Sequence, residues 1–142
     1  FLKNNHVWTS DVPNFHGTDA AVRISQLVPY AELYLARVDE SSFADGVKWA
    51  TKMECDIISC AIGISHYDED LFAALNRAME AGIVVVCAVS NYGRTKSNNA
   101  TFPALFGHCI AVGTCDNWGN REPTTAVCRE LDFVVRVPAP LS

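Results

Sequence analysis

His-Gly-Thr-Asp-Ala-Ala (residues 16–21) places an imidazole immediately before a short apolar segment with helical spacing. Gly17 would let another stretch of backbone approach closely, and Thr18 can accept hydrogen bonds from the first amides of a helix. A histidine in this position can face a cleft while the helix behind it is buried. A surface histidine at a turn would have the same local sequence, so the order of the following segments decides between the two interpretations.

Apolar spacing predicts alternating helices and strands along the rest of the chain. The first helix is expected at residues 18–27, and a second follows Ser41 or Ser42. A third starts after Asp68, which can cap it, and ends at Gly82. The apolar runs that predict strands are residues 31–38, 56–62, 83–89, 108–114 and 132–137.

Helices that alternate with continuous apolar strands are typical of an α/β fold, a mostly parallel sheet with helices on both faces and strands buried on both. Residues 1–142 are enough for one domain, in which residues 1–15 form a loop leading into His16. Reactive groups in such sheets gather beyond the carboxyl ends of the strands. His16, Gly63 and Asn91 each follow or neighbour a predicted strand end, so we expect them in that region.

Composition excludes several classes of protein. Hydrophobic residues make up 49% of the 142 and charged residues 19%, which favours a packed core over disorder. The net charge of -5, without a basic cluster, argues against a nucleic-acid partner. The longest uninterrupted apolar run, residues 83–89, is too short to span a membrane. No secretory signal is visible, and because the sequence begins at Phe1 rather than methionine, we interpret it as a fragment, a processed product or a recombinant segment.

The six cysteines do not have the spacing of a metal site. No Cys-x-x-Cys or His-x-x-x-His pair occurs, so we expect neither a zinc site nor another cofactor. Cys60, Cys87 and Cys109 lie in apolar strand-like runs, where a thiol acts as a small hydrophobe. Reduced core thiols favour an intracellular setting.

Several segments, taken in order, resemble motifs of the subtilisin-like serine peptidases, the subtilases. His16-Gly17-Thr18 resembles the family's catalytic histidine motif. Residues 88–93, Ala-Val-Ser-Asn-Tyr-Gly, resemble the Ala-Ala-Gly-Asn-x-Gly loop that carries the oxyanion asparagine. Further matching segments are Val-Pro-Tyr-Ala-Glu-Leu-Tyr (28–34), Asp-Ile-Ile-Ser (56–59), Phe-Pro-Ala (102–104) and Ile-Ala-Val-Gly (110–113).

The resemblance implies hydrolysis of peptide bonds in a peptide or protein substrate. By this resemblance His16 would be the general base and Asn91 would donate its amide to the oxyanion. Ala61, Ile62 and Gly63 would pair with the extended substrate by strand addition. A loop asparagine that bonds its own backbone and a turn glycine are the alternatives for Asn91 and Gly63.

Two catalytic motifs of the family do not occur in this sequence. They are the Asp-Ser-Gly or Asp-Thr-Gly of the catalytic aspartate and the Gly-Thr-Ser-x-Ala of the nucleophile, while Ala61-Ile62-Gly63 stands where Ser-Leu-Gly is usual. We therefore interpret residues 1–142 as the central part of a subtilisin-like domain, inactive alone. Its exposed apolar surface would call for a partner, either the remainder of the domain or another chain.

Two other functions are open at this point. A degenerate subtilase fold could serve as a binding or scaffold domain, as the missing motifs and the altered residues 61–63 suggest. A caspase-like cysteine peptidase would pair His16 with Cys60. Against it, Cys60 lies inside an apolar run, where a thiol is buried and inert.

Overall fold

Three helices and four strands lie along the residues that the computed structural model describes, 16–94 and 99–136, and only the β1-α3-β2 stretch alternates strand with helix. The predicted loop at residues 1–15 lies outside these residues. All three predicted helices and four of the five predicted strands are confirmed. The elements are α1 (His16–Leu27), α2 (Phe43–Lys52), β1 (Ile57–Cys60), α3 (Glu69–Glu80), β2 (Val84–Ala88), β3 (Ile110–Cys115) and β4 (Leu131–Arg136).

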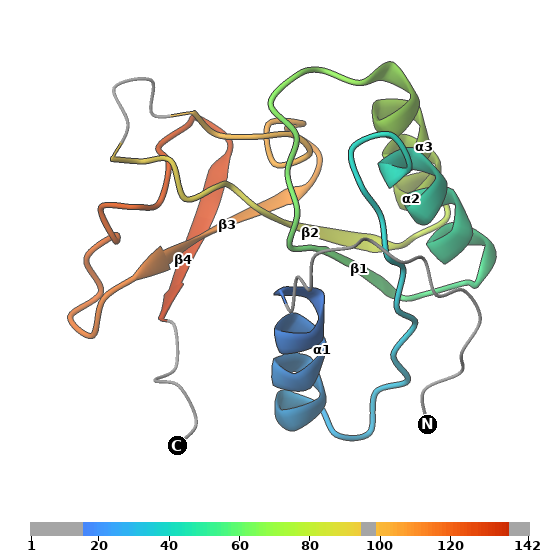
Figure 1. The fold of residues 1–142 in the computed structure, drawn as a ribbon, viewed down its shortest axis with the longest axis horizontal. Helices are drawn as coiled ribbons and strands as arrows, with labels where there is room; N and C mark the ends of the chain where they lie inside the picture. Colours follow the sequence, from blue (N-terminus) through green and yellow to red (C-terminus); the bar gives the residue numbers. More distant parts are fainter. Residues whose placement is uncertain (1–15, 95–98, 137–142) are drawn as a thin grey trace.

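The four strands form one parallel sheet in the order β1-β2-β3-β4 (Figure 1). Cys60 of β1 lies beside Cys87 of β2, and Cys87 lies beside Ala111 of β3. Helix α3 makes the crossover between β1 and β2. Because the strands run in the same direction, their carboxyl ends share one edge of the sheet, and the segments that follow β1 and β2 begin there.

Helices α2 and α3 lie on one side of the sheet, over β1 and β2 (Figure 1). Alternate residues of the strands, such as Ile58 and Val85, turn toward the helices and are buried. Leu71 and Leu75, one helical turn apart on α3, are both 0% exposed and belong to the same core. The amphipathic spacing of α3 therefore places its apolar stripe on the sheet.

The opposite face, which we call the open face, carries Ile57, Val84, Ile110, Phe133 and Val135. Ile57 and Phe133 are each 61% exposed. Helix α1 lies across β1 from α2 and α3 (Figure 1), but none of its residues is buried. The expectation of helices on both sides of the sheet therefore holds, whereas the prediction that both faces are buried is wrong for residues 16–94 and 99–136.

The predicted strand at residues 31–38 is not a strand. A strand needs a neighbour to satisfy its backbone hydrogen bonds, and none of the described strands pairs with this segment. Its side chains pack on α2 instead: the ring of Tyr34 lies edge-on to Trp49 at 6.1 Å between centroids. Val38 fills the space above Gly46, where an added Cβ would lie 2.5 Å from Val38 Cγ1. The apolar spacing of residues 31–38 therefore reflects packing on α2 and not pairing with another strand.

The ends of the helices follow the sequence signals in part. The Asp68 carboxylate accepts a hydrogen bond from the Leu71 amide at 2.6 Å, as predicted for the start of α3, and Gly82 ends it at φ +85°. Before α2, Ser42 occupies the capping position without a side-chain bond to the helix. Its hydroxyl instead donates to Asp39 at 2.7 Å. This bond and others from neighbouring Ser41 and Ser42 lower the pKa of Asp39 to about 2.

Candidate active site

His16 is the first residue of α1, and its ring lies beside the residue that follows β1. Its Nε2 is 2.8 Å from the carbonyl oxygen of Ala61, the residue that follows β1. A carbonyl oxygen only accepts hydrogen bonds, so Nε2 carries the proton in this arrangement. The ring is exposed, and the helix behind it leaves the imidazole open to solvent. The candidate base is therefore tied to the segment predicted to bind substrate.

Asn91 lies in the turn that follows β2, three residues after its last residue, and its side chain is exposed. The turn is docked on the chain between β3 and β4. The Gly93 amide donates to the Thr124 carbonyl at 2.8 Å. An added Cβ at Gly93 would lie 2.3 Å from the Thr125 carbonyl oxygen, so only glycine allows this approach.

The parallel pairing of β1 and β2 brings His16 and Asn91 to the same edge of the sheet. The last residue of β1, Cys60, is level with Cys87 near the end of β2. His16 contacts the residue after β1, and Asn91 follows β2. Both side chains therefore stand beyond the carboxyl ends of neighbouring strands, in the region where reactive groups of such sheets gather.

Residues 61–63 are not part of β1, which ends at Cys60. The chain here turns toward a separate antiparallel bridge, in which Ile64 exchanges two backbone hydrogen bonds with Phe102 at 2.8 and 2.9 Å. An added Cβ at Gly63 would lie 2.2 Å from Thr101 Oγ1. The close approach of Thr101 accounts for this glycine, while substrate pairing by Ala61, Ile62 and Gly63 stays a prediction.

Sequence reasoning missed the contact of half-buried Thr114 with buried Thr125, which lies beside the Asn91 turn. Thr125 is 2% exposed, and its hydroxyl accepts from the Thr114 amide at 2.9 Å. The two hydroxyls are 2.8 Å apart, and Arg121 donates to the Thr125 carbonyl. Gly113 leaves room for the Thr125 methyl group, since an added Cβ there would lie 2.2 Å from it. Threonines in a polar loop carry no pattern that predicts such burial.

Three thiols meet in the core under α3 and do not form a reactive site. Cys60 is 4% exposed and Cys87 is 1% exposed. Hydrogen bonds with Cys109 and Cys60, together with burial, raise the pKa of Cys87. All six cysteines are free. A buried Cys60 cannot reach a peptide, so the cysteine-peptidase alternative has no support.

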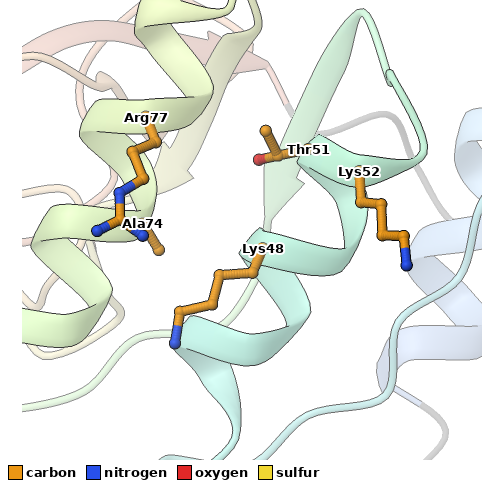
Figure 2. A pocket seen from close by; sticks show the side chains of 5 residues that line it. All are labelled: Lys48, Thr51, Lys52, Ala74 and Arg77. Atoms are coloured by element: carbon orange, nitrogen blue, oxygen red, sulfur yellow. The ribbon is translucent and has the colours of Figure 1, made fainter.

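Other features of the described residues do not form a second reactive centre. A hollow of about 280 Å³ between α2 and α3 is lined by Lys48, Lys52 and Arg77. Figure 2 shows the Lys52 ammonium pointing away from the Arg77 guanidinium, so the cations do not converge.

Within residues 16–94 and 99–136, no cluster of three His, Cys, Asp or Glu side chains could hold a metal ion. None of the helices described there has both the length and the apolar character needed to cross a membrane.

The sequence profile of the Subtilase family matches residues 10–139. The chain belongs to the subtilase family. It is 32% identical over 138 residues to Subtilisin DY of Bacillus licheniformis, covering 85% of this chain and 50% of the relative. It is 33% identical over 136 residues to the Thermostable alkaline protease of Halalkalibacterium halodurans, covering 84% and 37%. This subtilase chain thus spans half or less of the length of these curated relatives.

Solved structures contain the same fold as part of longer chains. The prenylagaramide maturation protease PagA superposes with a TM-score of 0.60 at 18% identity, covering 75% of this subtilase chain and 39% of PagA. The PatG macrocyclase in complex with peptide also gives 0.60 at 17% identity, covering 70% and 30%. The parallel sheet with its helices is therefore part of a larger subtilisin-like architecture.

Proposed function

We propose that this chain is the central part of a serine endopeptidase domain that hydrolyses peptide bonds when the domain is complete. The observation that carries the proposal is the position of His16 and Asn91 beyond the carboxyl ends of adjacent parallel strands in a subtilase chain. His16 acts as the general base and Asn91 donates its amide to the oxyanion. The aspartate and the serine come from segments outside residues 1–142.

The hydrogen bond between His16 and Ala61 defines what the missing aspartate must do. Nε2 now donates to the Ala61 carbonyl, whereas a general base needs a free lone pair on the nitrogen that faces the serine. A carboxylate that accepts from Nδ1–H fixes the other tautomer and frees Nε2. The remainder of the domain therefore moves the His16 ring from its contact with Ala61 into the catalytic orientation.

The same remainder of the domain covers the open face. Ile57, Val84 and Phe133 expose apolar surface across three strands, which a soluble domain buries against another element. Another protein chain with an apolar helix would satisfy the same surface. The substrate is an extended peptide or protein segment, which pairs with residues 61–63 by strand addition.

The test is peptide hydrolysis by the full-length protein and its His16→Ala variant, with His66→Ala as a matched control at an exposed loop histidine. We expect His16→Ala to lower kcat/KM by at least about 10²-fold, because general-base catalysis is lost, while His66→Ala changes nothing. Labelling of the wild type by a fluorophosphonate reports the serine independently. A wild type that neither hydrolyses peptides nor reacts with the fluorophosphonate would support the scaffold function instead.

A further inference from the structure

Ser90 has a backbone conformation that L-residues rarely adopt. Its φ is +128°, and it directly precedes Asn91. The family motif quoted for this turn has glycine at the corresponding place. A side chain in this region costs about 1–3 kcal/mol unless its surroundings compensate. A serine kept at such a position therefore suggests that its hydroxyl has a role that glycine cannot fill.

The Ser90 hydroxyl bridges the two sides of the turn that carries Asn91. It donates to the carbonyl of Asn99 at 2.5 Å, and it accepts from the amide of Tyr92 at 3.4 Å. Just below, the amide of Thr101 donates to the Val89 carbonyl at 3.0 Å. The departing and returning chains are thus joined at two successive levels.

Backbone contacts fix the turn on its other side. The Ser90 carbonyl accepts from the Ala126 amide at 3.3 Å, and the Gly93 amide donates to Thr124 at 2.8 Å. Asn91 therefore lies between two residues whose positions are fixed, while its own side chain is exposed at the edge of the sheet. Among these contacts, only the Ser90 hydroxyl links Asn91's turn to the returning chain at Asn99.

We propose that Ser90 is a positioning residue that holds the Asn91 amide in the geometry for oxyanion stabilisation. This inference rests on the proposed peptidase function and assigns Ser90 no contact with substrate. An oxyanion donor acts chiefly in the transition state, so a displaced donor lowers kcat more than it changes KM. A displacement of a fraction of an ångström suffices to lose part of the donor's effect.

The test compares Ser90→Ala and Ser90→Gly in the full-length protein, singly and combined with Asn91→Ala. Both Ser90 variants lack the hydroxyl, while glycine also removes the unfavourable φ and so retains the fold if alanine does not. We expect each to lower kcat about 10-fold with KM unchanged within about twofold. In the Asn91→Ala background, neither should lower kcat further, because Ser90 acts through Asn91.

Ser25→Ala is the matched control. The Ser25 hydroxyl also donates to a backbone carbonyl, that of Val22 at 2.8 Å, but it lies on α1. We expect wild-type kcat for this variant. Wild-type kcat in Ser90→Gly, or an undiminished further loss in the Asn91→Ala background, would overturn the role of Ser90 while leaving the peptidase function intact. A wild type without peptide hydrolysis would overturn both.

Discussion

The two faces of the sheet are built from similar residues and have different environments. On the covered face, Val85 of β2 and Leu75 of α3 are buried in one core. On the open face, Val84 and Phe133 are exposed to solvent. Val84 and Val85 are neighbours in one strand and differ only in the side to which they point. The apolar runs of this chain therefore encode two interfaces, of which residues 16–94 and 99–136 complete one.

The largest expected effect is the difference in stability loss between substitutions on the covered face and on the open face. Leu75→Ala removes a fully buried side chain and should lower the free energy of unfolding of the 142-residue chain by about 2–5 kcal/mol. Phe133→Ala should cost less than about 1 kcal/mol there, because that side chain is already exposed. Urea denaturation measures both. In the full-length protein the cost of Phe133→Ala should rise to about 3–5 kcal/mol, and equal costs in the two lengths would contradict burial of the open face in the complete domain.

The second effect concerns the Asn91 turn, at the carboxyl edge of the sheet. Gly93→Ala should destabilise the protein by about 1–3 kcal/mol, since the added Cβ would meet backbone atoms of Pro123 and Thr125 that cannot rotate away. Gly107→Ala is the matched control, because an added Cβ there has nothing within 4 Å. Thermal unfolding of the two variants measures the difference. A Gly93→Ala variant as stable as Gly107→Ala would contradict the docking of the Asn91 turn.

The smallest effect is a pH dependence on the side of α3. His108 stacks against Phe106 and lies edge-on to Phe72 of α3. Its Nε2 is buried and has no hydrogen-bond partner in the described part of the chain. Burial lowers the pKa of His108, because it disfavours the charged ring.

The direction of the pH dependence follows from that lowered pKa. The unfolded chain binds a proton near pH 6.5 and the folded chain only at lower pH, so the contribution of His108 is complete above about pH 6.5. It is lost as pH falls from there through the folded pKa. We expect the urea midpoint to drop between pH 7.5 and 5.5 by more in wild type than in His108→Phe. An equal drop in both would show that His108 does not contribute to this pH dependence.

The sequence predicted those parts of the fold that depend on local spacing. The three helices, the Asp68 cap and the left-handed Gly82 follow from signals within a few residues, whereas α1 begins two residues before its predicted start and Ser42 makes no cap bond. The strand at residues 31–38 was wrong because pairing needs a second segment, and apolar spacing does not say whether that segment is present. The open face escaped prediction for the same reason.

In the candidate site, too, features that depend on local motifs were predicted and features that depend on distant segments were not. Family motifs pointed to His16 and Asn91, and the parallel register places both at one edge. The contact between His16 and Ala61, the left-handed backbone of Ser90 and the burial of Thr125 depend on segments distant in sequence. Local patterns carry no information on such approaches.

The roles of His16 and Asn91 can be observed together in a crystal structure of the full-length protein after reaction with a peptidyl phosphonate. We expect the phosphonyl oxygen to lie about 2.7–3.1 Å from the Asn91 amide nitrogen. The His16 ring should then stand beside the modified serine, at the same edge of the sheet. An adduct elsewhere in the protein, or an Asn91 amide directed away from the phosphonyl oxygen, would contradict these roles.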